Sequence, residues 1–216
     1  YRMHPAIAAF SARRFYDGHL KDGVTAAERP PPAGFPWPRA DFPVALVQVS
    51  GTEQTSGEGS GGSGGSKSNK AEAHAVRAVL DALLNGRSNG AGGNSRLQPS
   101  EVGVITPYRA QEALLATMLQ DISGAAGAIE VSTIDSFQGR EKEVIVLSCV
   151  RANTAGSLGF LSDARRMNVA LTRAKRGLIV LGHAPTLGQH GTLWGAFVEW
   201  AKGEKVVLDF SAVKSL

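Results

Sequence analysis

The side chains with the clearest chemical potential are the arginines between Asp163 and Arg176. This segment carries five basic residues against one acidic residue, an excess equal to the formal net charge of +4 of the whole chain. A guanidinium is always charged, and its planar fork of donors suits phosphate oxygens and the charge that spreads over a phosphoryl group in transfer. Concentrated basic charge is typical of proteins that bind polyanions, although a solvated helix face is the ordinary alternative for a short run.

A helix over 162–174 would place two of these arginines together. Arg166 and Arg173 fall on one stripe of such a helix, beside an apolar stripe that can face a sheet. The helix could then pack and present two guanidiniums at once, which predicts that Arg173 acts as an arginine finger. A surface ion pair is the usual role of a single arginine, but it does not explain the concentration of charge.

Polar residues also stand at the ends of two predicted strands. Thr106 and Tyr108 follow one apolar run, and Ser132 and Thr133 close the strand predicted over 131–133. At strand ends such groups can hydrogen-bond to nucleic-acid phosphate or stack on a sugar or base. The Thr106-Pro107 pair is equally a plain strand terminator.

A turn follows the second of these strands. In it Gln138 precedes Gly139, where the absence of a side chain lets the backbone approach a ligand closely. Glu141 follows at a distance from which its carboxylate could reach a ribose hydroxyl. The alternative is a simple glycine turn with a solvated glutamate, which Gln-Gly alone would favour.

The elements that must position these residues alternate along the chain. Runs of Val, Ile and Leu, several of them apolar throughout, predict strands buried on both faces at 44–49, 102–106, 131–133, 144–150, 178–182 and 206–210. Apolar residues at helical spacing lie at 71–84, 110–119, 162–174 and 192–201. This alternation predicts an α/β fold with a mostly parallel sheet.

Other residues have ordinary structural interpretations. His4 before Pro5 reads as a helix entry, and Asn69 and Glu72 as a cap and a first-turn acid. Cys149 lies in an apolar run and reads as a small buried hydrophobe.

Length and composition exclude several classes of protein. The 216 residues suit a single domain, in which 51–69, rich in Gly and Ser, and 85–99 read as flexible insertions. No Gly-Lys-Ser or Gly-Lys-Thr occurs, so the sequence has no Walker-type phosphate loop. One Cys and five His without zinc-ligand spacing predict no metal site, and no apolar run is long enough for a membrane helix. The chain begins with Tyr1 and without a secretory signal, as expected for a fragment of an intracellular protein, cytoplasmic or nuclear.

Four segments together carry a resemblance to a known family: Tyr1-Arg2-Met3-His4-Pro5, 104–111, 131–143 and 165–175. In order and spacing they resemble the motifs of the second RecA-like domain of up-frameshift-type superfamily 1 helicases, the group of the nonsense-mediated-decay RNA helicase and senataxin. The resemblance spans nearly the whole chain and is interrupted by the Gly/Ser insertion and the proline-rich stretch 29–38.

The resemblance implies a fold and a set of site residues. It implies one RecA-like domain over 1–216, of the P-loop NTPase type but lacking its own P-loop. In that family the arginines at Arg2 and Arg173 reach the γ-phosphate and Tyr1 packs near the adenine. Nucleotide coupling is implied for Gln138, with nucleotide contacts for Gly139 and Glu141.

The function implied is that of the C-terminal motor domain of an ATP-dependent helicase that moves along single-stranded RNA or DNA in the 5′-to-3′ direction. ATP and Mg²⁺ would be held mainly by the first RecA-like domain, which this sequence does not contain, so the isolated chain is expected to be inactive. One rival is a catalytically inactive nucleic-acid-binding or scaffolding module. A small-molecule α/β enzyme would need a nucleophile or cofactor loop that the sequence lacks.

Overall fold

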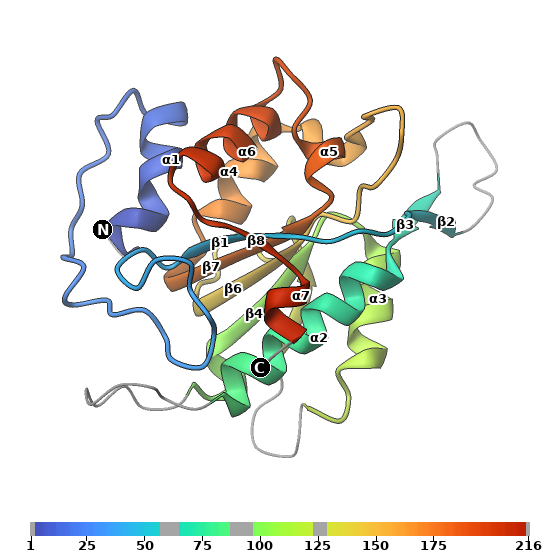
Figure 1. The fold of residues 1–216 in the computed structure, drawn as a ribbon, viewed down its shortest axis with the longest axis horizontal. Helices are drawn as coiled ribbons and strands as arrows, with labels where there is room; N and C mark the ends of the chain where they lie inside the picture. Colours follow the sequence, from blue (N-terminus) through green and yellow to red (C-terminus); the bar gives the residue numbers. More distant parts are fainter. Residues whose placement is uncertain (1–2, 57–64, 87–96, 123–128, 215–216) are drawn as a thin grey trace.

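A parallel sheet forms the centre of the chain (Figure 1). The computed structural model describes residues 3–56, 65–86, 97–122 and 129–214. Within them a six-stranded sheet has the order β5-β4-β6-β7-β1-β8, and each strand is parallel to its neighbours. The strands are β1 (Val44–Gln48), β4 (Val102–Thr106), β5 (Glu130–Thr133), β6 (Lys142–Ser148), β7 (Ala174–Gly182) and β8 (Val207–Asp209). The predicted α/β class is confirmed.

Helices cover both faces of this sheet (Figure 1). One face carries α1 (Pro5–Phe15), α4 (Ala164–Leu171), α5 (Ala184–Leu187) and α6 (Leu193–Gly203). The other carries α2 (Lys70–Asn85), α3 (Arg109–Met118) and α7 (Ser211–Lys214). Two short 3-10 helices, η1 (Pro99–Glu101) and η2 (Gly159–Ser162), precede β4 and α4.

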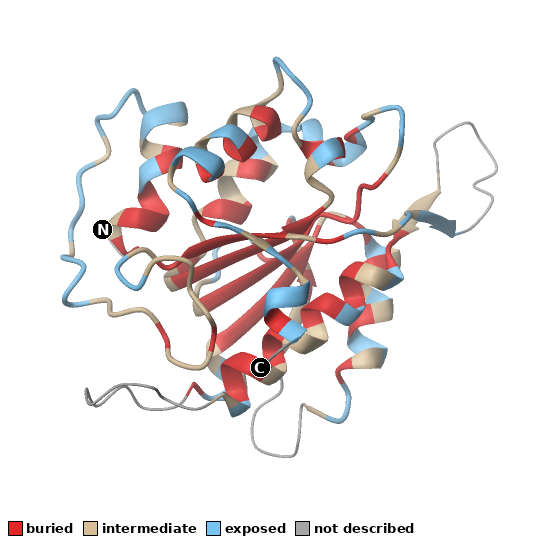
Figure 2. Cartoon of the chain, in the orientation of Figure 1, coloured by how far each residue is buried: buried red, intermediate tan, exposed pale blue. Residues whose placement is uncertain are grey.

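The strands are apolar throughout because both of their faces are covered. In β1, Val44 and Leu46 belong to the core under α1, α4 and α6, whereas Ala45 and Val47 belong to the core under α2 and α3. Figure 2 shows the central strands buried along most of their length. Cys149 is buried as predicted, and burial raises the pKa of its thiol.

Two helices begin as their sequences predict. Pro5 is the first residue of α1, and the Nδ1 atom of His4 accepts a hydrogen bond from the Ala6 amide at 3.0 Å. Burial lowers the pKa of His4, which favours the neutral ring that this acceptor role requires. In α2 the Asn69 side chain accepts from the Glu72 amide at 3.1 Å. Both caps satisfy amides that a helix start leaves without an intrahelical partner.

The ends of the predicted insertion 51–69 are ordered. β2 (Gln54–Ser56) and β3 (Ser66–Ser68) form an antiparallel hairpin, in which Lys67 Nζ donates to Thr55 Oγ1 at 3.1 Å. Residues 57–64 lie outside the described part, as do residues 87–96 of the second predicted insertion. The prediction of a flexible loop over the whole of 51–69 is therefore wrong at both of its ends.

The predicted helix over 162–174 is wrong in its extent. Helix α4 ends at Leu171, with Thr172 as its cap, and β7 begins at Ala174. The Arg173 carbonyl accepts from the Lys142 amide at 3.2 Å, so the chain there already pairs with the first residue of β6. Because strand pairing holds this backbone, Arg173 lies at the junction of helix and strand and shares no helical stripe with Arg166.

Candidate nucleotide and nucleic-acid interface

The predicted site residues lie at two ends of the sheet. Thr106 and Thr133 are paired last residues of the parallel strands β4 and β5, so they mark the carboxyl edge. Glu141 precedes β6 and Arg173 precedes β7, so both lie at the amino edge. Thr106 and Thr133, predicted for nucleic acid, are thereby separated along the strands from Glu141 and Arg173, predicted for nucleotide.

At the amino edge, Arg173 is folded against the end of α4. Its Nε donates to the Val169 carbonyl at 3.0 Å, and Nη2 donates to Thr172 Oγ1 at 3.0 Å. The last carbonyls of a helix lack intrahelical donors, and a cation there also interacts favourably with the helix dipole. The half-buried guanidinium therefore stabilises the helix end in this conformation.

The start of the chain reaches the same edge. Lys175, near the start of β7, forms an ion pair with Glu141 at 3.0 Å. The Lys175 carbonyl accepts from the His4 amide at 2.8 Å, which anchors the entry of α1 beside β7. Tyr1 and Arg2 lie outside the described residues, so their predicted contacts with adenine and γ-phosphate have no structural description here.

Gln138 and Gly139 are exposed in the segment that joins β5 to β6. Gly139 has φ +86°, and beyond its two chain neighbours no described atom lies within 4 Å of the position that a Cβ would occupy. A residue with a side chain would be strained there by the backbone conformation, not by lack of space. The geometry fits both the ligand-approach interpretation and the plain glycine turn.

At the carboxyl edge, Thr106 and Tyr108 are buried. Thr106 is 0% exposed, and its Oγ1 has no hydrogen-bond partner in the described structure. Tyr108 is 3% exposed, and its hydroxyl accepts from Arg151 Nη1 at 3.2 Å. Neither side chain offers a surface to a nucleic-acid strand in this conformation, and a direct contact by either stays a prediction.

Ser132 and Thr133 lie beside them on β5. Ser132 is 5% exposed, whereas Thr133 is half-buried. Thr133 Oγ1 donates to Ser136 Oγ at 2.9 Å and accepts from the Ser136 amide at 3.2 Å. The hydroxyls of Thr133 and Ser136 therefore stabilise the turn after β5, and Thr133 is more accessible than Ser132.

Arg166 is held by the same turn. Its Nε and Nη2 each donate to a different carboxylate oxygen of Asp135, both at 2.9 Å. This hydrogen bonding raises the pKa of Arg166 above its ordinary value. The ion pair ties α4 to the segment between β5 and β6, a constraint that sequence spacing did not indicate.

Arg151 is a buried arginine that the sequence motifs did not indicate. It follows β6, is 4% exposed, and donates from Nε to Glu53 Oε2 at 2.9 Å. Burial opposes ionisation of Glu53, but hydrogen bonds from Asn153, Arg151 and the Ala152 amide lower its pKa to about 2. The signal available in the sequence was the Arg-Ala-Asn run directly after an apolar strand.

Glu72 lies in the first turn of α2, as predicted, but its carboxylate belongs to a buried network. It is 0% exposed, and its Oε2 accepts from Ser148 Oγ and from the Val150 amide, both at 2.7 Å. Burial raises the pKa of Glu72 to about 7. Val150 has φ +72°, a conformation that is rare for a β-branched residue, and Glu72 holds its amide. Glu72 therefore fixes the chain where it leaves β6 towards Arg151.

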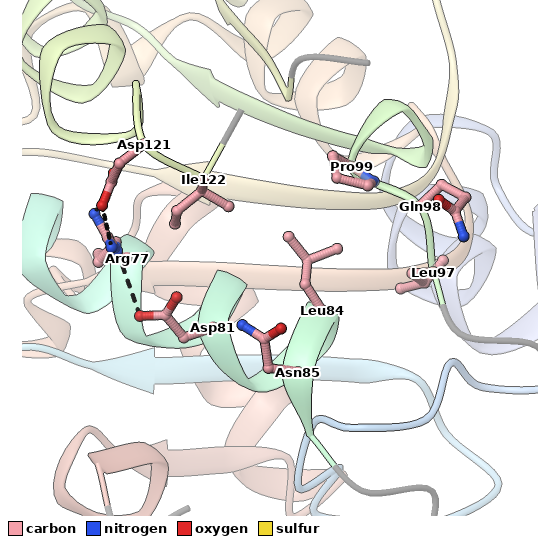
Figure 3. Close-up of a pocket in the computed structure, with 9 residues that line it drawn as sticks. All are labelled: Arg77, Asp81, Leu84, Asn85, Leu97, Gln98, Pro99, Asp121 and Ile122. Carbon is pink, nitrogen blue, oxygen red and sulfur yellow. Dashed lines mark hydrogen bonds and ion pairs between the residues drawn. The ribbon is translucent and has the colours of Figure 1, made fainter. Parts of the chain in front are cut away.

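A solvent-open hollow of about 540 Å³ lies elsewhere, between the end of α2 and η1 (Figure 3). On its wall Arg77 forms hydrogen bonds with Asp121 at 2.7 and 2.8 Å. None of the predicted site residues that the structure describes lines it. In the part of the chain described, no group of three or more His, Cys, Asp or Glu side chains could hold a metal ion. No helix there is long and apolar enough to cross a membrane.

Comparison with known proteins identifies the family. Residues 1–185 match the model of the AAA domain family, and the chain belongs to that family. The Drosophila melanogaster "Regulator of nonsense transcripts 1 homolog" is 38% identical over 216 residues, 98% of this chain and 17% of that protein. The Schizosaccharomyces pombe "ATP-dependent helicase upf1" is 39% identical over 221 residues, 100% of this chain and 22% of that protein. The Saccharomyces cerevisiae "ATP-dependent helicase NAM7" is 38% identical over 200 residues, 90% of this chain and 19% of that protein.

These relatives confirm the resemblance to up-frameshift-type superfamily 1 helicases that the motifs predicted. The chain spans about a fifth of the length of the relatives it matches. The similarity therefore identifies the family of this chain, and the activity of a whole protein that contains it is a proposal.

Proposed function

We propose that this chain is the C-terminal motor domain of an ATP-dependent helicase that moves along single-stranded RNA or DNA. The observation that carries the proposal is the similarity, over nearly the whole chain, to proteins named as ATP-dependent helicases. The resemblance of the motifs adds the 5′-to-3′ direction. The alternative, an inactive nucleic-acid-binding or scaffolding module, would be expected to bind strands without contributing to ATP hydrolysis.

The residues at the amino edge fit a polyphosphate ligand. Arg173 and Lys175 supply cationic donors there, and Glu141 supplies an acceptor for a ribose hydroxyl. ATP, when bound, supplies the phosphoryl group whose transfer to water drives the cycle. Mg²⁺ and most of the ATP contacts are assigned to the first RecA-like domain.

Arg173 would act by moving its guanidinium from the end of α4 towards the developing charge. That movement gives up, among its contacts, the hydrogen bonds to the Val169 carbonyl and Thr172 Oγ1, each of which contributes about 1 kcal/mol net. Contacts with the γ-phosphoryl group would be charge-assisted and form fully only in the transition state, which is the condition for accelerating the reaction. Arg2 and Gln138 would act at the same ligand, and Tyr1 and Gly139 would hold the nucleotide.

Single-turnover ATP hydrolysis by a full-length enzyme that carries this domain tests the proposal, with nucleic acid saturating. Arg173→Ala should lower the rate by about 10³-fold or more, while ATP binding changes far less. Arg173→Lys should recover little, because lysine keeps the charge but loses the planar fork.

The matched control is Arg14→Ala, since Arg14 is an exposed arginine in the last turn of α1. Arg176 is unsuitable because its Nε donates to the Pro30 carbonyl at 2.9 Å and its loss would disturb packing. Equal, small losses in the Arg173 and Arg14 variants would contradict the finger. Unchanged hydrolysis in both would favour the docking module.

A further inference from the structure

Phe160 is the most exposed large hydrophobic side chain in the described ranges, with 53% of its surface accessible. It lies in η2, on the path from the carboxyl end of β6 to α4. Its neighbours Leu158 and Leu161 are buried. The chain therefore turns one aromatic ring outward between two residues that anchor the segment.

A contact with a buried aromatic side chain restricts the orientation of the Phe160 ring. Tyr108 lies against it, with ring centroids 5.4 Å apart and an angle of 43° between the planes. The Tyr108 hydroxyl is in turn held by Arg151. Tyr108, which was predicted to hydrogen-bond to phosphate or to stack on a sugar or base, is thus the buried support of a ring that is itself exposed.

Gly159 permits this arrangement. Its φ is +55°, and a Cβ at this position would collide with the Arg151 guanidinium and lie 2.8 Å from Tyr108 Oη. Any other residue would displace the two side chains that support Phe160. The backbone at Gly159 therefore passes close to Arg151 and Tyr108, and this close approach brings the Phe160 ring against Tyr108.

The surroundings of Phe160 are charged and not apolar. The Arg166 guanidinium carbon lies 5.4 Å from the ring centroid and is held there by Asp135. Arg165 and Asp163 are exposed nearby in sequence, and Asp163 is the N-cap of α4. A protein partner would need a contiguous apolar patch, whereas one exposed ring beside the Arg166 guanidinium matches a nucleobase attached to a phosphate backbone.

We propose that Phe160 is a stacking platform for one base of a bound single strand, at the carboxyl edge that also carries Thr133. This inference rests on the proposed nucleic-acid function and names the residue that would contact a base. Stacking on an aromatic face is tolerant of sequence, because every base has such a face. The Arg166 guanidinium lies over this ring, so the base would take its place on the ring face, and the displaced charge would favour the adjacent phosphate.

The test measures binding of a short fluorescent single-stranded oligonucleotide to the 216-residue chain by anisotropy at about 50 mM salt, where phosphate contacts are least screened. Phe160→Ala should weaken binding by roughly 5- to 100-fold, the range for loss of one stacked base. Phe160→Leu keeps an apolar contact with Tyr108 but has no aromatic face, so it should lose nearly as much. Phe160→Trp should bind at least as well as the parent chain.

Tyr16→Ala is the matched control, because Tyr16 is another exposed aromatic residue, with 43% of its surface accessible. Its hydroxyl accepts a hydrogen bond from Asn168 of α4. This variant should leave affinity unchanged. A scan with one abasic nucleotide at each position should find a position that weakens the parent chain but not Phe160→Ala. Unchanged affinity for Phe160→Leu, or the same abasic profile in parent and variant, would overturn the stacking role. Absence of any binding by the parent chain would instead overturn the nucleic-acid part of the proposed function.

Discussion

Replacing Glu72 by glutamine should remove a pH dependence from the stability of this domain. The pKa of Glu72 is raised by burial from the ordinary 4.5 to about 7. Between these two values the folded chain keeps a proton on Glu72 that the unfolded chain has released. The free energy of unfolding therefore falls as pH rises through this interval.

The size of the effect follows from the difference between the two pKa values. About 1.4 kcal/mol for each pKa unit gives roughly 3 kcal/mol lost between about pH 4.5 and pH 7. Glu53 lies close enough to add repulsion to an ionised Glu72, and Cys149 is the other titratable group coupled to it. Glutamine cannot ionise, and its amide oxygen can still accept from the Val150 amide.

Urea unfolding at a series of pH values from about 5 to about 8 measures this effect. We expect Glu72→Gln to lie within about 1 kcal/mol of the parent chain near pH 5 and to be the more stable of the two by up to roughly 3 kcal/mol at pH 8.

Glu72→Ala provides the contrast. It leaves the Val150 amide and the Ser148 hydroxyl without their acceptor, so it should be destabilised at every pH, by about 1–3 kcal/mol for each buried group left unpaired. A difference between Glu72→Gln and the parent chain that stays flat over the whole pH range would refute the reasoning, because it would mean that Glu72 ionises as easily in the folded chain as in the unfolded one.

Three further outcomes are expected. The isolated chain should hydrolyse ATP at background rate in a phosphate-release assay, because it has no Walker-type loop, and robust turnover would contradict the division of the site between two domains. Its binding to single strands should weaken steeply with added salt in anisotropy titrations, and an affinity that is flat with salt would exclude phosphate contacts. Glu53→Gln should make the free energy of unfolding depend less on pH below about 4.5, because a carboxyl whose pKa is lowered to about 2 contributes stability that is lost as pH falls below its ordinary 4.5. If acid unfolding followed by circular dichroism showed the same pH dependence in the variant and the parent chain, the Arg151–Glu53 pair would contribute nothing to stability.

Local patterns determined much of this molecule. The apolar runs predicted the parallel strands, since a strand covered on both faces must be apolar at successive positions, as Val44 to Val47 are. The entry of α1 at His4 and Pro5 also followed from the sequence, because a helix cap depends on residues close together in the chain. The four motifs were sufficient to indicate the helicase family.

Tertiary contacts decided the position of Arg173. Its segment continues a helical pattern, but pairing of its carbonyl with Lys142 of β6 ends the helix before it. The partner lies 31 residues away, so helical periodicity within the segment contained no sign of it.

Tertiary contacts also decided the burial of Glu72. It lies on the apolar stripe of Val76, Val79 and Leu83, which was a signal in the sequence, yet an acid in a first helical turn is ordinarily solvated. Whether a carboxylate on such a stripe can be buried depends on donors supplied from elsewhere, here Ser148 and the Val150 amide at the end of β6. Only the folded chain brings those donors to it, because hydrogen bonds between distant segments are set by how the layers pack and not by local pattern.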